Sequence, residues 1–237
     1  MYAVIPAKTN STRIPNKNFK EFDPRNGDSL TDILIKKLLK VFKPGDIFLS
    51  SENYDVIEPF GEKYGIIPIS REERFTDNDC PFKAWFNDTY RDVCRQTAPR
   101  SFFPTIMWCQ VTDPIFNDHA AMLRKWNEIN DYDSMVALYP CKGYFLDDRF
   151  RPQGWGFGPW HVKSQNLPQM YEMPFTCSIL NSTAMTEVGY HIGATPHYMR
   201  VDSPKIDIDT PHDWDYAQYL YQKAFDEDAN PIGYLHK

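Results

Sequence analysis

The sequence is short of glycine, of basic charge and of paired cysteines, and each shortage excludes a class of protein. Only 11 glycines stand against 19 prolines in 237 residues, which predicts rigid loops in a globular chain. The formal net charge of -6 argues against general nucleic-acid binding, because such binding needs basic residues clustered on one face. No run of about 18 apolar residues and no charged leader with an apolar core occurs. We therefore expect a soluble, cytoplasmic protein that binds neither membrane nor nucleic acid.

The cysteines and histidines form no sequence motif. The 5 cysteines are widely spaced and contain no Cys-x-x-Cys pair, so they indicate neither a disulfide framework nor a zinc site. Reduced thiols in a cytoplasm fit this pattern best. The 6 histidines are equally scattered, without a His-x-x-x-His spacing, and we interpret them as packing or surface residues.

Short apolar runs alternate with segments of helical periodicity along most of the chain. The expected strands cover residues 2–4, 47–49, 66–69, 105–109, 134–138, 176–180 and 197–201. Helices are expected from Ser29 to about Phe42, after a cap at Asp79, after Asn117 or Asp118, and after Pro211. A further helix is expected to begin only near Glu58, because Pro59 would otherwise lie inside it. This alternation predicts a mostly parallel α/β sheet in one domain over residues 1–237.

Residues 140–175 interrupt the alternation. Glycines and prolines are mixed there with aromatic residues such as Trp155, Phe157 and Trp160, a composition typical of bent antiparallel ribbons. Exposed aromatics at this density would form an apolar patch, which serves either as a lid over the domain's own core or as a subunit interface. We favour the interface and predict a homodimer.

A polar, basic loop follows the first expected strand. Lys8, Arg13 and Lys17 are interleaved there with hydroxyl and amide side chains, including Ser11 and Asn18. Such a loop can surround an anion on several sides and is interpreted as a triphosphate-binding loop. An ordinary solvated basic loop is the alternative that composition leaves open.

Two acidic residues share one side of an extended segment near the end of the chain. In Ile206-Asp-Ile-Asp209 the carboxylates of Asp207 and Asp209 face one way and the isoleucines the other, because side chains alternate along a strand. Paired carboxylates are suitable ligands for hydrated Mg²⁺ that also contacts substrate phosphates. A solvent-facing strand or a helix cap gives the same pattern without a metal.

A third candidate follows the expected strand at residues 105–109. Gln110, Thr112 and Asp113 lie just beyond its carboxyl end, where open α/β sheets bind ligands. A simple turn at Asp113-Pro114 is the structural alternative.

Together these stretches resemble the acylneuraminate cytidylyltransferase family, which makes CMP-sialic acid and, more distantly, CMP-Kdo. The family's opening motif is matched at Ile5-Pro-Ala7, Ser11, Arg13-Ile-Pro15 and Lys17-Asn18. Its middle motif, Gln-Pro-Thr-Ser-Pro-Leu-Arg, aligns with residues 110–116, and its Ile-Asp-Ile-Asp-Thr-x-x-Asp motif with residues 206–213. Lys8 replaces an Arg, Thr12 a Lys, Asp113 a Ser and Phe116 an Arg of the family pattern.

The resemblance implies a Rossmann-like fold of the nucleotide-diphospho-sugar transferase (GT-A-like) type with a small antiparallel dimerisation extension. It also implies transfer of CMP from CTP to the anomeric hydroxyl of a sugar acid. The implied catalytic residues are Asp209, Lys17 and Arg13; nucleotide-binding residues are Ala7, Lys8, Ser11 and Asn18; substrate-binding residues are Gln110 and Asp113; and Mg²⁺ ligands are Asp207 and Asp209. Lys142, Arg149 or Arg151 is implied as a partner for the carboxylate of the sugar acid.

Two other functions remain open at this point. A metal-dependent glycosyltransferase of GT-A type also uses an Asp-x-Asp pair, but that pair usually lies near mid-chain. A non-catalytic nucleotide-binding homologue would account for the departures at Lys8, Thr12 and Phe116.

Overall fold

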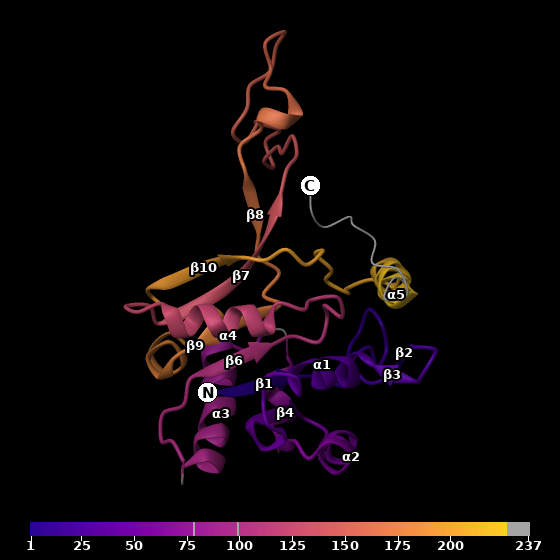
Figure 1. Ribbon diagram of the computed structural model, residues 1–237, viewed down its shortest axis with the longest axis vertical. Helices are drawn as coiled ribbons and strands as arrows, with labels where there is room; N and C mark the ends of the chain where they lie inside the picture. The colour runs from indigo at the N-terminus through magenta and orange to yellow at the C-terminus, as the bar shows by residue number, and fades with distance from the viewer. Residues whose placement is uncertain (78, 99, 227–237) are drawn as a thin grey trace.

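A central sheet organises the molecule. The computed structural model describes residues 1–77, 79–98 and 100–226 (Figure 1). The strand order is β10-β7-β9-β6-β1-β4-β5, and β8 pairs with β7 outside this path. These strands are β1 (Tyr2–Pro6), β4 (Ile47–Ser51), β5 (Ile67–Ser70), β6 (Ile106–Cys109), β7 (Ser134–Cys141), β8 (Met170–Glu172), β9 (Cys177–Leu180) and β10 (Pro196–Arg200).

Most strands of the sheet are parallel. Strand β1 is parallel to β4 and to β6, β4 to β5, and β10 to β7. The exception inside the sheet is β9, which lies antiparallel between β6 and β7. The predicted mostly parallel α/β fold is therefore confirmed.

Helices cover both faces of the sheet. They are α1 (Leu30–Leu38), α2 (Tyr54–Tyr64), α3 (Phe82–Thr97), α4 (His119–Glu128) and α5 (Pro211–Asp226), with short helical turns at Pro44–Asp46, Glu73–Thr76, Ser164–Asn166 and Ala184–Val188. Along β1, Ala3 and Ile5 join the core shared with α1, α2, α4 and α5, whereas Tyr2 and Val4 join the core shared with α3. The alternation of side chains along a strand thus divides the apolar residues between two cores. None of the helices in the described ranges is long and apolar enough to cross a membrane.

Local sequence signals account for several boundaries. Ser29 caps α1 in a capping box with Asp32, as the sequence predicts, and a two-stranded ribbon of β2 (Glu21–Asp23) and β3 (Asp28–Ser29) precedes it. Gly65 ends α2 with a φ of 70°. Strand β5, which contains Pro68, lies at the edge of the sheet, as expected for a strand that lacks one backbone donor.

Three local predictions are wrong. Helix α2 begins at Tyr54, so Pro59 lies inside it and not at its start. The helix tolerates this proline at the cost of one backbone hydrogen bond. Helix α3 has Pro81 at its cap position without a side-chain hydrogen bond, while the amide of Asp79 donates to the Asp77 carboxylate in the preceding turn. Helix α1 also ends at Leu38, earlier than predicted, and hydrogen-bonded turns continue to Phe42.

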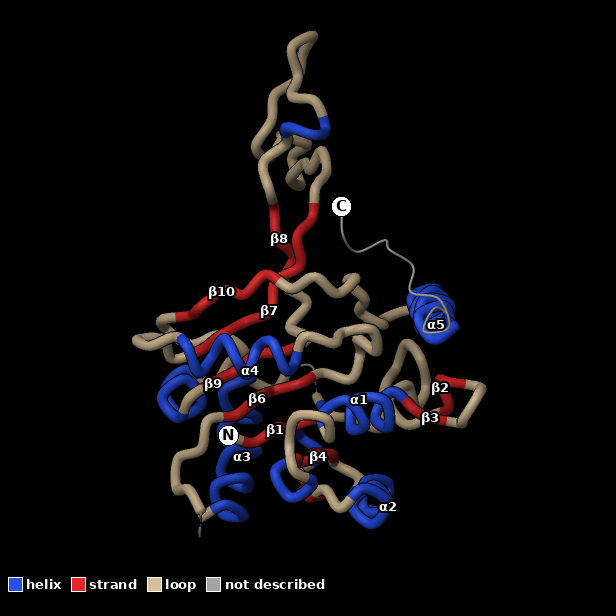
Figure 2. The backbone as a smooth tube through the Cα atoms, in the orientation of Figure 1, coloured by secondary structure: helices blue, strands red, loops and turns tan. Residues whose placement is uncertain are grey.

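An arm projects from the sheet. Strand β7 continues out of the body and pairs antiparallel with β8, and beyond this pair residues 142–169 form irregular loops around one short helical turn (Figures 1 and 2). The most exposed aromatic side chains of the arm are those of Trp160, Phe150 and Phe157, at 92%, 77% and 71%. The antiparallel ribbon predicted over residues 140–175 is thus present at the base of the arm and in one isolated bridge between Leu146 and Pro152, whereas its role in dimerisation remains a prediction.

Candidate active site

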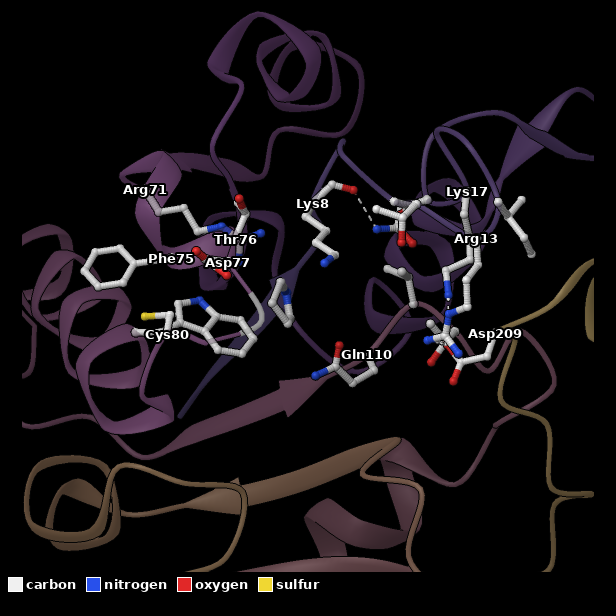
Figure 3. Close-up of a pocket in the computed structure, with 18 of the residues that line it drawn as sticks. Lys8, Arg13, Lys17, Arg71, Phe75, Thr76, Asp77, Cys80, Gln110 and Asp209 are labelled. Carbon is white, nitrogen blue, oxygen red and sulfur yellow. Dashed lines mark hydrogen bonds and ion pairs between the residues drawn. The ribbon is translucent and has the colours of Figure 1, made fainter.

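A cavity of about 470 Å³ opens beyond the carboxyl ends of β1 and β6. Its cationic end holds Arg13, Lys17 and Asp209, and its other end holds Arg71, Phe75, Thr76, Asp77 and Cys80 (Figure 3). Lys8 and Gln110 lie between the two ends. The lining consists of Pro6, Lys8, Ser11, Thr12, Arg13, Ile14, Lys17, Asn18, Arg71, Phe75, Thr76, Asp77, Cys80, Phe82, Trp85, Gln110, Val111, Thr112 and Asp209.

The loop after β1 is folded so that its cations meet the acidic segment from the end of the chain. Ile14 is anchored in the core, and Asn16 adopts a left-handed φ of 53°, which asparagine tolerates. On either side of this turn, Arg13 lies 2.8 Å from an Asp209 carboxylate oxygen and the Lys17 ammonium lies 3.4 Å from the same oxygen. Lys17 also donates to the carbonyl of Ile208. The structure thus brings the basic loop and the acidic segment, two of the three predicted motifs, into direct contact.

Lys17 is the more enclosed of the two cations. Its side chain is 12% exposed, compared with 63% for Arg13. Burial lowers the pKa of Lys17, and the Asp209 carboxylate acts against this effect. An anionic ligand at this end would replace or join Asp209 as the counter-charge that a half-buried ammonium requires.

The start of the loop is tied to the sheet. The backbone amide of Ala7 donates to Ser50, and the Ala7 side chain is buried in the core. Asn18 is buried and its side-chain amide donates to the Lys8 carbonyl at 2.8 Å, while its Oδ1 atom has no protein partner. Ser11 and Lys8 line the cavity directly. Of the predicted nucleotide-binding residues, Ala7 therefore offers only backbone atoms.

The opposite end of the cavity contains residues that the sequence did not single out. Arg71, which follows β5, is 6% exposed and lies 3.3 Å from the Glu52 carboxylate and 5.4 Å from the Trp85 ring. Glu52 also accepts hydrogen bonds from the amide and the hydroxyl of Thr9 at 2.6 Å. Burial raises the pKa of Glu52, but the bonds from Thr9 and the charge of Arg71 outweigh it and lower that pKa.

Two buried donors at this end have no protein acceptor. They are Nε of Arg71 and Nε1 of Trp85. Buried donors in native proteins are nearly always satisfied, so a ligand atom or water is expected here. The only sequence signal for Arg71 was a basic residue two positions after the strand expected over residues 66–69, and no spacing rule selects it.

Asp207 lies next to the cationic end. It is half-buried and accepts a hydrogen bond from Thr112, and the amide of Ile208 donates to the Thr112 carbonyl at 3.0 Å. Burial raises the pKa of Asp207, and the charge of Asp209 adds to this effect. Two neighbouring carboxylates beside the cationic end, of which Asp209 lines the cavity, fit the donor set of hydrated Mg²⁺, which needs only one or two carboxylates besides phosphate oxygens.

Asp113 does not line the cavity. It is buried, and its carboxylate accepts hydrogen bonds from the Tyr139 hydroxyl at 2.6 Å and from the amides of Ile115 and Phe116. The structural alternative of a turn at Asp113-Pro114 therefore describes it better than contact with a substrate. Gln110, three positions earlier, does face the cavity (Figure 3). Its backbone amide continues the β6–β9 ladder by donating a hydrogen bond to the Thr176 carbonyl.

The three basic residues proposed to meet a sugar carboxylate are on the arm and do not line this cavity. Arg151 is paired with Asp147 at 2.6 Å, and Lys142 donates to the carbonyl of Gln165. Arg149 is exposed. None of them contributes to the site within one copy of the chain.

Comparison with known proteins rests on structure alone, because no family model and no curated protein sequence matches the chain. Over 94% of this chain and 98% of the other, it superposes with a TM-score of 0.63 and 11% identity on CMP:2-keto-3-deoxy-manno-octonic acid synthetase complexed with CTP. The chain has a nucleotidyltransferase fold.

Other solved structures support that fold. A putative glucose-1-phosphate thymidylyltransferase from Bacillus anthracis matches with a TM-score of 0.62, 10% identity, and coverage of 93% of this chain and 95% of that one. The 4-diphosphocytidyl-2C-methyl-D-erythritol synthase of Anaerococcus prevotii matches with 0.56 and 11%, covering 93% and 96%. The predicted nucleotidyltransferase fold is thus confirmed at identities that carry no information on substrate.

Proposed function

We propose that the chain is a cytidylyltransferase that transfers CMP from CTP to the anomeric hydroxyl of a sugar acid and releases pyrophosphate. The observation that carries this proposal is the meeting of Arg13 and Lys17 with Asp209 at one end of a cavity beyond β1 and β6. Cations for phosphates and carboxylates for a metal are both needed to bind a metal nucleotide, and they converge here from opposite ends of the chain.

Arg13, Lys17, Lys8 and Ser11 would hold the triphosphate. Phosphoryl and nucleotidyl transfer depend on positioning and on neutralising the charge that accumulates on the leaving pyrophosphate. Asp209 shares one carboxylate oxygen with both Arg13 and Lys17. Phosphate oxygens would take over these two cations and release Asp209 for chemistry.

The nucleoside would lie toward Arg71 and Trp85. The unpartnered Nε of Arg71 and Nε1 of Trp85 are suited to acceptor atoms of a pyrimidine such as its carbonyl oxygen. The Glu52 carboxylate holds Arg71 in place from the other side. Asn18 belongs to the loop after β1, and its Oδ1 atom has no protein partner. This oxygen would accept a hydrogen bond from the nucleoside.

The reaction forms a bond between the anomeric oxygen and the α-phosphorus and breaks the bond from that phosphorus to pyrophosphate. Asp209 would accept the proton of the attacking hydroxyl. Asp207 and Asp209 would hold Mg²⁺, which would supply charge neutralisation to the phosphates and lower the cost of ionising that hydroxyl. Arg13 and Lys17 would stabilise the departing pyrophosphate.

The acceptor would occupy the side of the cavity near Gln110. Its amide can contact hydroxyl or carboxyl groups of a sugar acid from the end of β6. A second copy of the chain, bound through the arm, would bring Lys142, Arg149 or Arg151 within reach of the acceptor carboxylate. The proposal therefore includes a homodimer. The cytoplasm is its proposed location.

The test is pyrophosphate release from each of the four common nucleoside triphosphates with a panel of sugar acids and neutral sugars, with Mg²⁺ present and then removed by chelation. We expect release with CTP and at least one sugar acid only when Mg²⁺ is present. Transfer or hydrolysis from a CMP-sugar without pyrophosphate release would favour the glycosyltransferase. Thermal stabilisation by CTP with no turnover would favour a non-catalytic nucleotide-binding protein.

A further inference from the structure

Three soft or borderline metal ligands meet inside the core, behind the cavity. Cys109 is the last residue of β6, Cys177 is the first residue of β9, and the two are direct partners in the antiparallel ladder. His119 is the first residue of α4, which packs on the same face of the sheet. The sulfur atoms and an imidazole nitrogen of these residues all lie within 4.8 Å of one another. Each of the three side chains is buried, at 0% for both cysteines and 3% for the histidine.

The spacing of the sulfur atoms suits one shared ion. Sγ of Cys109 lies 3.8 Å from Sγ of Cys177. Four-coordinate zinc with bonds of about 2.3 Å to sulfur places two thiolates about 3.8 Å apart, at adjacent corners of a tetrahedron. A disulfide requires about 2.05 Å, so the two sulfur atoms are separate thiols here.

The donor atoms and the charge select the class of ion. Two thiolates and one neutral imidazole balance Zn²⁺, and one thiolate beside one protonated thiol balances Cu⁺, so either loaded site would place no net charge in the core. Thiolate and imidazole ligands favour Zn²⁺ and Cu⁺ over Mg²⁺ or Ca²⁺, which require oxygen. Met122, three positions further along α4, is fully buried in the same core and would be a candidate for a fourth ligand.

We propose that Cys109, His119 and Cys177 form a structural site for one thiophilic d¹⁰ cation, Zn²⁺ or Cu⁺. The two metals share the ligand chemistry, and separate titrations distinguish them. This proposal does not depend on the proposed function, because the cluster does not line the cavity.

The position of the ligands indicates which part of the chain a bound ion would stabilise. Cys109 immediately precedes residues 110–118 and His119 immediately follows them, so one ion would close both ends of this loop. Gln110, Val111 and Thr112 of the loop line the cavity, and the carbonyl of Thr112 holds the amide of Ile208 at 3.0 Å. A bound ion would therefore fix the wall of the cavity that carries Gln110 and supports the acidic pair.

The first experiment uses the 237-residue chain without substitutions. It is produced in medium supplied with Zn²⁺ or, separately, with copper under reducing conditions, and its metal content is measured after extensive dialysis. We expect about one equivalent of one of these ions per chain. Refolding with Co²⁺ should give a thiolate-to-cobalt charge-transfer absorption, which a histidine and carboxylate site on the surface would lack. Protein that holds neither ion and gives no such absorption would overturn the proposal.

The second experiment compares variants of the cluster with a matched control. Cys177→Ala and His119→Gln are expected to weaken the affinity for the bound ion at least about 100-fold, because each removes one direct ligand. Cys94→Ala, at a half-buried thiol outside the cluster, should keep the full metal content. Equal metal binding by Cys177→Ala and the unsubstituted protein would contradict the site. A Cys109–Cys177 disulfide detected by mass spectrometry in protein purified with reductant would also contradict it. His119→Gln retains both thiols and serves as the second variant where Cys177→Ala does not fold.

Discussion

Arg13 and Asp209 form an ion pair of 2.8 Å although 196 positions separate them in the chain. Both side chains are substantially exposed, at 63% and 41%, so the pair contributes at most about 1 kcal/mol to folding. The pair places a cation that could bind phosphate beside a carboxylate that could bind a metal ion or accept a proton. The following predictions separate that function from stability.

Asp209→Asn should remove turnover and leave the fold intact. Loss of a general base lowers the rate by roughly 100- to 10,000-fold, whereas loss of an exposed ion pair changes the free energy of unfolding by about 1 kcal/mol or less. Pyrophosphate release and urea unfolding measure the two effects. Asp215→Asn, at an exposed position of α5, is the control and should change neither. Activity of Asp209→Asn close to that of the unsubstituted protein would exclude Asp209 as base and metal ligand.

Lys17→Met should weaken CTP binding. A hydrogen bond to a charged group contributes about 1.5–3 kcal/mol, so the Kd for CTP should rise roughly 10- to 100-fold. Calorimetric titration with CTP measures this change. Lys40→Met removes an exposed lysine away from the cavity and should leave the Kd unchanged. A loss of affinity that is equal in both variants would indicate a general effect of net charge and not a phosphate contact.

Arg71→Met should be strongly destabilising. Its guanidinium and the Glu52 carboxylate are both nearly enclosed, at 4% and 8% side-chain exposure, and removing one partner of a buried pair costs about 3–5 kcal/mol. Arg74→Met breaks a comparable contact with Glu72 on the surface, at 69% and 60% exposure, and should cost about 1 kcal/mol or less. Urea unfolding of the two variants gives the difference. Equal losses would mean that Thr9 alone satisfies Glu52.

The buried Asp113 carboxyl should give the protein a characteristic pH dependence. Burial raises the pKa of Asp113 to about 6, although hydrogen bonds from Tyr139 and the amide of Phe116 act against it. The folded state therefore binds this proton more tightly than the unfolded chain does, for which the pKa is about 3.9. Through this group the free energy of unfolding falls as the pH rises from about 4 to about 6.

Asp113→Asn isolates that contribution, because its amide oxygen can still accept from the backbone amides of Ile115 and Phe116 while its NH2 group donates to the Tyr139 hydroxyl. The difference in unfolding free energy between the protein and this variant should change across pH 4 to 6, in favour of the variant at the higher pH. Unfolding in urea at several pH values measures it. A difference that is constant over this window would show that Asp113 does not titrate there.

The arm should carry the dimer interface. Replacement of Phe150, Phe157 and Trp160 by Ser removes its most exposed aromatic side chains, and we expect a monomer in place of a dimer in analytical ultracentrifugation at micromolar concentration. Phe102 and Phe103 are similarly exposed, at 72% and 73%, outside the arm, and their replacement by Ser is the control. A monomeric unsubstituted protein would exclude the interface.

The sequence predicted the fold where periodicity is strong. Runs such as Ile47–Leu49 are buried on both faces, and the capping pattern at Ser29 and Asp32 depends only on neighbouring residues. Pro59 and Asp79 were misplaced because the cost of one missing hydrogen bond, or the gain from one cap, is small compared with the packing of a whole helix. Local signals of about 1 kcal/mol do not decide such boundaries.

Within the candidate site, the residues that carry motifs were predicted and those that depend on chain pairing were missed. The loop around Arg13 and the segment with Asp209 stand out by charge and spacing. Arg71 has no motif and joins the cavity only because β5 pairs with β4. Cys109 and Cys177 meet only through the register of β6 and β9, which the sequence does not reveal. Asp113 was assigned to substrate because a position after a strand says nothing about which way the side chain turns.

Strand β7 connects the arm directly to the interior of the molecule. The same strand that pairs with β8 in the arm carries Tyr139, whose hydroxyl holds the Asp113 carboxylate behind the cavity wall. The arm and the loop that carries Gln110 are thus connected through one continuous strand and one hydrogen bond of 2.6 Å.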